Sequence, residues 1–280
     1  MDDTTVVITG ANGQLGRALC IVFPKAIALT RQELDITDEA AVKSFDWQPN
    51  SVIINAAAWT DVDAAENPEN FQQVDLVNHH AVRYLAEAAT THGLTLVHIS
   101  SEYVFDGSQT IHSEDELFSP LNVYGKTKAD GDLAAATTNK HYIIRTSWVI
   151  GDGRNFVNIM QDLAARGVKP SVVNDQIGRL TFTDTLARGI KHLLEIGAPY
   201  GTYNLTNEGQ PVSWADIAKI VFEKSGKSPS DVQPVSTAEY FANKPGSAQR
   251  PRQSALNLTK IKETGFTPED WQDKLDSLFN

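Results

Sequence analysis

The sequence predicts an α/β fold built around a doubly wound parallel sheet. Three observations lead to this prediction. Short apolar segments recur through residues 1–150, helical patterns separate them, and the apolar segments are almost continuously hydrophobic. Strands that are covered by helices on both faces have no polar face, so they lack the alternation of a half-exposed strand. A regular succession of strand and helix is typical of parallel sheets.

The expected elements follow from these patterns along the chain. Strands are expected at residues 5–9, 26–29, 51–55, 94–100 and 141–147, and helices at 15–23, 39–45, a long region 64–91, and 124–136. After residue 150 the pattern is less regular, with short strands at 172–173 and 203–205, a helix at 184–196 that could return to the sheet, and a serine-capped helix at 213–225. The stretch 226–251 is rich in Ser, Pro and Gly, which predicts loops over a cleft.

Composition excludes several classes of function. The 280-residue chain has 41% hydrophobic residues, enough for a sizeable core, and a net charge of −11. That charge argues against nucleic-acid or anionic-membrane partners, which attract clustered Lys and Arg. Cys20 is the one cysteine, so no internal disulfide forms and a reducing compartment is expected. No signal peptide or membrane-length apolar run is visible, and we expect a cytoplasmic protein.

A glycine-rich loop follows the first expected strand and opens the first expected helix. Its glycines, Gly10, Gly13 and Gly16, are spaced G-x-x-G-x-x-G. Glycine permits a tight turn and close backbone approach, and the helix N-terminus offers free N–H groups to a pyrophosphate. The loop therefore predicts a Rossmann-type dinucleotide site that also includes Asn12, Gln14 and Leu15. No Gly-Lys-Ser/Thr sequence suggests nucleotide hydrolysis.

Further cofactor contacts are expected at the ends of the next strands. Arg31 follows the second strand, where a guanidinium could pair with a 2′-phosphate, so NADPH is favoured over NADH; a surface arginine is the alternative interpretation. Asp35 and Ile36 are expected near the adenine. The remaining expected contacts follow later strands: Ala56, Ala57, Ala58, Trp59, Thr60 and Ile99. Residues 1–149, joined by 181–206, are thus predicted to bind NAD(P), and 150–180 with 207–280 to form a smaller α/β substrate-binding region.

The predicted catalytic group is Tyr124 and Lys128 on one helix with Ser101 upstream. Residues four apart lie one above the other on a helix, and Ser101 lies where an apolar strand stops. A hydroxyl, a phenol and an ammonium together can move a proton to and from a carbonyl oxygen. A second Tyr-x-x-x-Lys, Tyr240 to Lys244, has Ile217 at the position that matches Ser101, and no glycine-rich loop precedes it. We interpret this copy as a short helical turn with a solvated lysine.

Five segments together resemble one family. They are residues 100–107, 122–128, 145–149, 173–178 and 250–256, and the resemblance extends from about residue 5 to residue 275. The chain resembles the dTDP-4-dehydrorhamnose reductase family of the extended short-chain dehydrogenases/reductases. The resemblance implies reduction of the C4 ketone of dTDP-4-dehydro-L-rhamnose, with Tyr124 as proton donor. It also implies that Lys128 holds the nicotinamide ribose and lowers the phenol pKa, and that Ser101 orients the carbonyl.

The resemblance also suggests substrate contacts. Trp148 matches a position that contacts the sugar, although a core indole is the alternative. Glu102 stands where the family commonly has aspartate, and Arg250 is expected to face the dTDP pyrophosphate. Leu180 replaces a usual proline, which leaves that loop's details open. The implied partner is a dTDP-sugar, and we expect a monomer or weak homodimer.

Two rival functions remain open. One is a related nucleotide-sugar epimerase or 4,6-dehydratase, although Tyr103 stands where a dehydratase carries its second acid. The other is a non-catalytic, NADP-binding regulatory subunit. No metal is expected, because the seven histidines show no ligand spacing. Asp61, Asp63 and Glu66 are expected to charge the start of a helix rather than to bind an ion.

Overall fold

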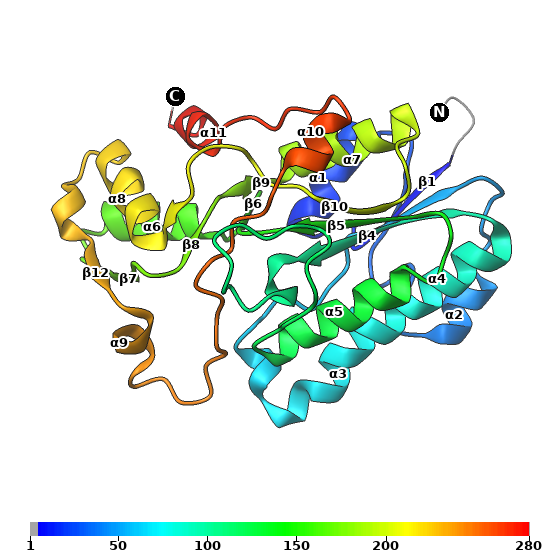
Figure 1. The fold of residues 1–280 in the computed structure, drawn as a ribbon, viewed down its shortest axis with the longest axis horizontal. Helices are drawn as coiled ribbons and strands as arrows, with labels where there is room; N and C mark the ends of the chain where they lie inside the picture. The colour runs from blue at the N-terminus through cyan, green and yellow to red at the C-terminus, as the bar shows by residue number, and fades with distance from the viewer. Residues whose placement is uncertain (1–4, 280) are drawn as a thin grey trace.

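The computed structural model, which describes residues 5–279, contains a six-stranded parallel sheet and confirms the predicted fold class (Figure 1). The strand order is β10-β5-β4-β3-β1-β2, with β1 Val6–Thr9, β2 Ile27–Leu29, β3 Val52–Asn55, β4 Thr95–Ser101, β5 His141–Thr146 and β10 Gly201–Asn204. After β2 the chain crosses β1 to form β3 on its other side. The carboxyl ends of β1 and β3 therefore flank the topological switch point, where parallel sheets bind ligands.

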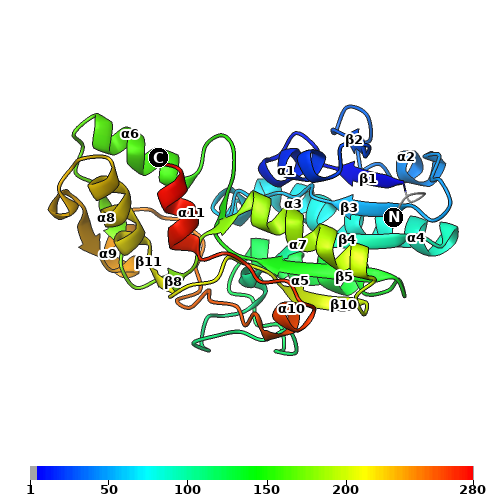
Figure 2. The same ribbon diagram turned by 90° about the horizontal axis from the view of Figure 1, so that it is seen from above.

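Helices cover both faces of this sheet (Figures 1 and 2). On one face lie α1 (Gln14–Val22) and α7 (Thr183–Ile196), and on the other α2 (Glu39–Ser44), α4 (Ala81–His92) and α5 (Val123–Ala135). Val6 and Ile8 of β1 pack into the first layer and Val7 into the second. Both faces of the strand are buried, which explains its continuous apolar sequence. Helix α7, which covers the expected helix at 184–196, packs on α1 over the first of these faces.

The expected long helix at 64–91 is wrong. The region is divided into the 3-10 turns η1 (Ala64–Glu66) and η2 (Pro68–Asn70), α3 (Phe71–Asp75), a π-helical turn η3 (Leu76–His80), and α4. Pro68 has no N–H to continue the first turn, and the Asn67 side chain caps the second. In the π-helical turn, Asn78 accepts a hydrogen bond from Trp59 N (2.9 Å) and donates to Trp59 O (3.2 Å). The irregular turn thus fixes the segment that follows β3.

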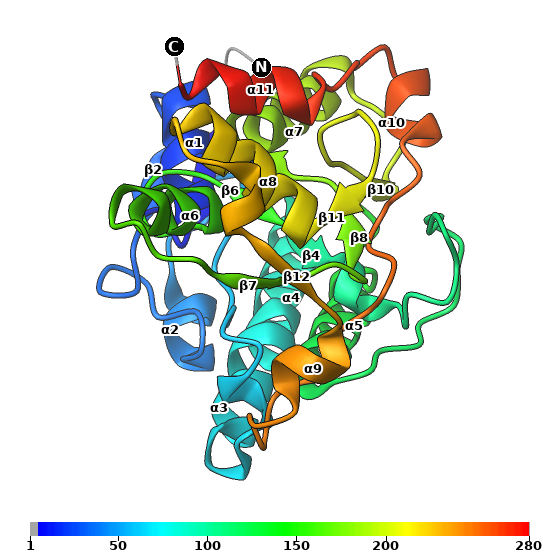
Figure 3. The same ribbon diagram turned by 90° about the vertical axis from the view of Figure 1, so that its left-hand side faces the viewer.

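Beyond residue 147 the chain builds a second layered region with its own apolar cluster. Its helices are α6 (Phe156–Ala165), α8 (Trp214–Lys224), α9 (Thr237–Phe241) and α11 (Trp271–Ser277). Its strands form three short pairs: β6 (Val149–Ile150) with β9 (Thr181–Phe182), β7 (Ser171–Val173) with β12 (Gln233–Val235), and β8 (Ile177–Gly178) with β11 (Val212–Ser213). Leu180, Phe222 and Trp271 are buried in this cluster. Figure 3 shows α6, α8 and α9 in front of the sheet.

The remaining elements are short. The turn η4 (Glu102–Val104) follows β4, and the turn η5 (Pro229–Asp231) precedes β12. Helix α10 (Thr259–Glu263) packs beside β10. Ser213 caps α8 as predicted, through a capping box with Asp216. Among residues 5–279, no helix is long and apolar enough to cross a membrane.

Candidate active site

The glycine-rich loop lies against the segment after β3, and two of its glycines are required by close contacts. Gly10 has a φ of 70°, and a Cβ there would lie 2.6 Å from Ala57 N. A Cβ on Gly16 would lie 2.2 Å from Gly10 O. Any side chain at either position would displace backbone, so glycine is what brings the start of α1 and the end of β3 to the same cavity.

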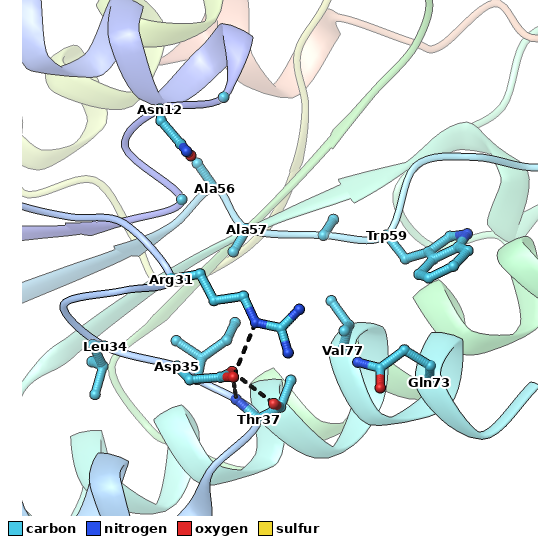
Figure 4. A pocket seen from close by; sticks show the side chains of 14 residues that line it. Asn12, Arg31, Leu34, Asp35, Thr37, Ala56, Ala57, Trp59, Gln73 and Val77 are labelled. Atoms are coloured by element: carbon cyan, nitrogen blue, oxygen red, sulfur yellow. Dashed lines mark hydrogen bonds and ion pairs between the residues drawn. The ribbon is translucent and has the colours of Figure 1, made fainter. Parts of the chain in front are cut away.

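That cavity, of about 310 Å³, opens at the switch point (Figure 4). Ten of the expected cofactor contacts line it: Gly10, Asn12, Gly13, Arg31, Asp35, Ile36, Ala56, Ala57, Ala58 and Trp59. Sequence reasoning missed Leu34, Thr37, Gln73 and Val77, which also line it. The first two flank the predicted Asp35-Ile36 pair. Gln73 and Val77 are four residues apart in α3 and η3, the helical segment whose Asn78 bonds to Trp59. A spacing of four places both side chains on one helix face, so the sequence could have revealed them as a pair.

Several expected contacts lie beside the cavity rather than in its wall. Leu15 is buried in the core between α1 and the sheet. Gln14 Oε1 accepts a hydrogen bond from Gly151 N at 2.9 Å, which ties the loop to the segment after β6. Thr60, Ile99, Tyr124 and Lys128 are likewise absent from the lining.

Arg31 and Asp35 form an ordered pair at the far end of the cavity. Arg31 Nε donates to Asp35 Oδ2 at 3.0 Å, and Thr37 N and Oγ1 donate to Asp35 Oδ1 at 3.0 and 2.6 Å. Figure 4 shows the Arg31 side chain reaching across the opening. With 71% of its side chain exposed, the guanidinium is accessible to an anionic group.

Helix α5 carries a row of three buried polar residues, Tyr124, Lys128 and Asp132, at a spacing of four. Asn122 fixes the start of the helix, because its side chain accepts a hydrogen bond from Gly125 N at 2.7 Å. Glu66 Oε1 accepts another from Val123 N at 2.7 Å. These two caps satisfy N–H groups of the first turn and hold Tyr124 against the end of β4.

Ser101 is the last residue of β4 and lies beside Tyr124, so the structure brings the predicted hydroxyl and phenol together. Burial, and next the charge of Glu102, raise the pKa of Tyr124, while the hydrogen bond with Ser101 opposes the rise. The expected lowering of this pKa by Lys128 does not outweigh the effect of burial. The Lys128 ammonium donates to Ile99 O at 2.6 Å, and desolvation of the phenol dominates.

Lys128 itself lies in a buried network that the sequence analysis missed. Burial lowers the pKa of Lys128 to about 8, and the charge of Asp132 opposes the decrease. His98 Nε2 lies 3.5 Å from Lys128 Nζ, and burial, then the charge of Lys128, hold the His98 pKa well below its ordinary value. Arg145 Nε donates to Asp132 at 3.0 Å. The four-residue spacing of Lys128 and Asp132 could have revealed this network, because residues four apart are neighbours on a helix.

A second cavity, of about 350 Å³, lies between the sheet and the second region. Arg250 lines it, and its guanidinium pairs with Asp63 at 2.7 Å. The other wall residues include five aromatic side chains and a lysine: Tyr103, Phe156, Trp214, Tyr240, Phe241 and Lys244. Trp148, with a φ of 46°, stacks on Trp214 with ring centroids 3.8 Å apart.

The second Tyr-x-x-x-Lys is a short helical turn, as expected. Helix α9 ends at Phe241, so Lys244 lies beyond it. The lysine is exposed, and its Nζ lies 3.4 Å from the centre of the Tyr240 ring. The residue 23 positions before Tyr240 is Ile217, so this copy lacks a serine at the spacing that separates Ser101 from Tyr124.

The acidic residues after β3 stabilise local structure, as expected, but each acts on a different group. Asp61 accepts a hydrogen bond from Ala64 N, Asp63 pairs with Arg250, and Glu66 caps α5.

A cavity at the switch point of a parallel sheet, with a buried Ser at the end of a neighbouring strand and a buried Tyr and Lys on the helix packed against that strand, is typical of oxidoreductases of the short-chain dehydrogenase/reductase type. Comparison with known proteins gives the particular family. Residues 4–280 match the family model described as RmlD substrate binding domain. The chain belongs to this family, which includes the dTDP-4-dehydrorhamnose reductases.

Three relatives illustrate the similarity. The chain is 40% identical to dTDP-4-dehydrorhamnose reductase of Aggregatibacter actinomycetemcomitans, over 98% of this chain and 97% of the relative. It is 35% identical to dTDP-4-keto-6-deoxy-D-glucose reductase of Streptomyces niveus, over 98% and 96%. The structure of dTDP-4-dehydrorhamnose reductase from Bacillus anthracis in complex with NADP is 34% identical, with a TM-score of 0.89 and 98% of each chain covered.

Proposed function

We propose that this protein reduces the C4 ketone of dTDP-4-dehydro-L-rhamnose with NADPH. The observation that carries the proposal is the placement of Ser101 at the end of β4 and of Tyr124 and Lys128 in the first half of α5, where Tyr124 packs in one cluster with Trp59, a residue of the cavity wall. The names of the relatives support the substrate class, and the NADP in the Bacillus anthracis enzyme supports the cofactor.

The residues of the first cavity fit NADPH. The glycine contacts leave backbone N–H groups at the start of α1 for a pyrophosphate, and Arg31 is accessible for a 2′-phosphate. When bound, the cofactor supplies a hydride to the carbonyl carbon. Ser101 donates a hydrogen bond to the carbonyl oxygen, Tyr124 gives that oxygen its phenolic proton, and Lys128 stabilises the resulting phenolate by its charge.

The second cavity suits the nucleoside diphosphate end of the substrate. Its aromatic side chains offer faces for a base or sugar, and Arg250 and Lys244 offer positive charge for the diphosphate. We assign residues 150–180 and 207–280 to a substrate-binding domain, with 1–149 and 181–206 as the cofactor-binding domain. Trp148 is the proposed contact to the sugar; Glu102, which the resemblance suggests as a second contact, is buried and lies against Ser101.

The test is oxidation of NADPH, followed by its absorbance, with dTDP-4-dehydro-L-rhamnose made by a coupled dehydratase and epimerase. We expect sugar-dependent turnover. Tyr124→Phe should lower kcat by at least about 100-fold, the size of a lost general acid, while NADPH binding stays nearly unchanged. Tyr200→Phe, a substitution at a half-exposed tyrosine elsewhere, is the control. Turnover of Tyr124→Phe within tenfold of wild type would overturn its assigned role.

A second candidate substrate is dTDP-4-keto-6-deoxy-D-glucose, favoured by the relative from Streptomyces niveus. Omitting the epimerase from the coupled assay presents this sugar alone. Turnover that does not need the epimerase would support the second substrate. Binding of NADPH without turnover of either sugar would instead support a non-catalytic subunit.

A further inference from the structure

Glu102, next to Ser101, is a buried carboxyl group without a cationic partner among residues 5–279. Only 2% of the residue is exposed, and no ion pair to it forms within 4.0 Å. Ser101 Oγ lies 2.8 Å from Glu102 Oε2, and Glu102 Oε1 has no hydrogen-bond partner. A buried carboxylate is costly unless it is paired and fully hydrogen-bonded. This environment therefore favours the neutral acid.

The groups that face Glu102 add no compensating positive charge. Tyr103 in its own turn and Tyr124 of α5 are phenols whose ionised forms it would repel. Ser254, from the segment after α9, contributes a hydroxyl. Lys128 directs its ammonium to Ile99 O instead. Burial raises the pKa of Glu102 to about 8, against smaller opposing effects of Ser101, the backbone of Glu102 and Ser254.

The hydrogen bonds available to Ser101 make the protonation state of Glu102 important. A serine hydroxyl has one proton and two lone pairs. Tyr103 N donates to Ser101 Oγ at 3.2 Å and uses one lone pair. If Glu102 were ionised, the single Ser101 proton would be held by the carboxylate. If Glu102 is neutral, its carboxyl proton occupies the second lone pair, and the Ser101 proton is directed away from Glu102, to Tyr124 or to a substrate carbonyl.

We propose that Glu102 works as a neutral acid that donates its carboxyl proton to Ser101, so that Ser101 can donate its own proton to the substrate carbonyl. This inference rests on the proposed function. Glu102 is a positioning residue, because it acts through Ser101 and transfers no proton in the reaction. A neutral Glu102 also helps Tyr124, since the charged form would raise the pKa of the phenol.

The substitution Glu102→Gln tests this role, because an amide is a permanent donor of similar size and does not titrate. The measurement is kcat/KM for the ketosugar between pH 6 and pH 9.5 in wild type and variant. At pH 6.5 we expect the two to agree within about threefold. Above the Glu102 pKa of about 8, the ratio of variant to wild type should rise by up to about tenfold per pH unit. Titration of Lys128 affects both proteins and cancels in the ratio.

Other outcomes are equally clear. A ratio that stays constant across the pH range overturns the proposal. So does a loss of about 100-fold at pH 6.5 with NADPH affinity unchanged, because that result means that the sugar requires a carboxylate acceptor. If wild type turns over neither ketosugar, the proposed function fails instead. The pH dependence of unfolding, which needs no substrate, then decides the protonation state of Glu102.

Discussion

The buried carboxyl of Glu102 makes a prediction about stability that is independent of activity. Burial raises its pKa from 4.5 to about 8, so below pH 4.5 the folded and unfolded chains are both protonated there. As pH rises, the unfolded chain loses this proton first, and the folded state loses about 1.4 kcal/mol per pH unit until its own carboxyl titrates. Relative to a variant with glutamine at this position, wild type should therefore lose about 3 kcal/mol of stability between pH 4.5 and pH 7, and about 4 kcal/mol by pH 8.

Urea unfolding of wild type and Glu102→Gln at several pH values between 5 and 9 measures this difference. We expect the variant to become progressively more stable than wild type as pH rises, with a plateau above about pH 8. Glu223→Gln, which removes an exposed carboxylate, is the matched control for the change in net charge. A difference between wild type and Glu102→Gln that does not depend on pH would refute the neutral, buried carboxyl.

Three further substitutions test other parts of the structure. Gly10→Ala should cost at least about 2 kcal/mol in urea unfolding and weaken NADPH binding, because its Cβ would lie 2.6 Å from Ala57 N at a φ of 70°; unchanged NADPH affinity would contradict the close approach of the glycine-rich loop to the segment after β3. Arg31→Ala should raise KM for NADPH more than for NADH, and equal effects would remove the role in 2′-phosphate selection. Asp132→Ala should cost about 3–5 kcal/mol in urea unfolding, because it leaves the Arg145 guanidinium buried without its carboxylate; a cost below about 1 kcal/mol would show that this pair is not important for stability.

The sheet could be predicted from the sequence because its signals are local. Continuous apolar strands, a glycine loop and a Tyr-to-Lys spacing of four each depend on a few adjacent residues. The region 64–91 could not be predicted, because its breaks depend on what Asn78 contacts across space, at Trp59. His98 was missed for a similar reason: within an apolar strand, only its distance to Lys128 distinguishes it from a core residue.

The sequence could also not predict the electrostatic state of the site, since desolvation depends on the complete fold. The expected effect of Lys128 on Tyr124 considered one charge and omitted burial, which is the larger influence on the phenol.

Glu102 and Lys128 titrate near the same pH, so the charge near Tyr124 changes at both groups over one pH range. The pKa of each is about 8, one raised and the other lowered by burial. Well below that pH, Lys128 is positive and Glu102 neutral, so the pair carries a net positive charge that favours loss of the phenolic proton. Well above it, Lys128 is neutral and Glu102 negative, so the pair opposes that loss. Because ionised Glu102 raises the pKa of the Tyr124 phenol, we expect proton donation by Tyr124 to be more efficient below about pH 8 than above it.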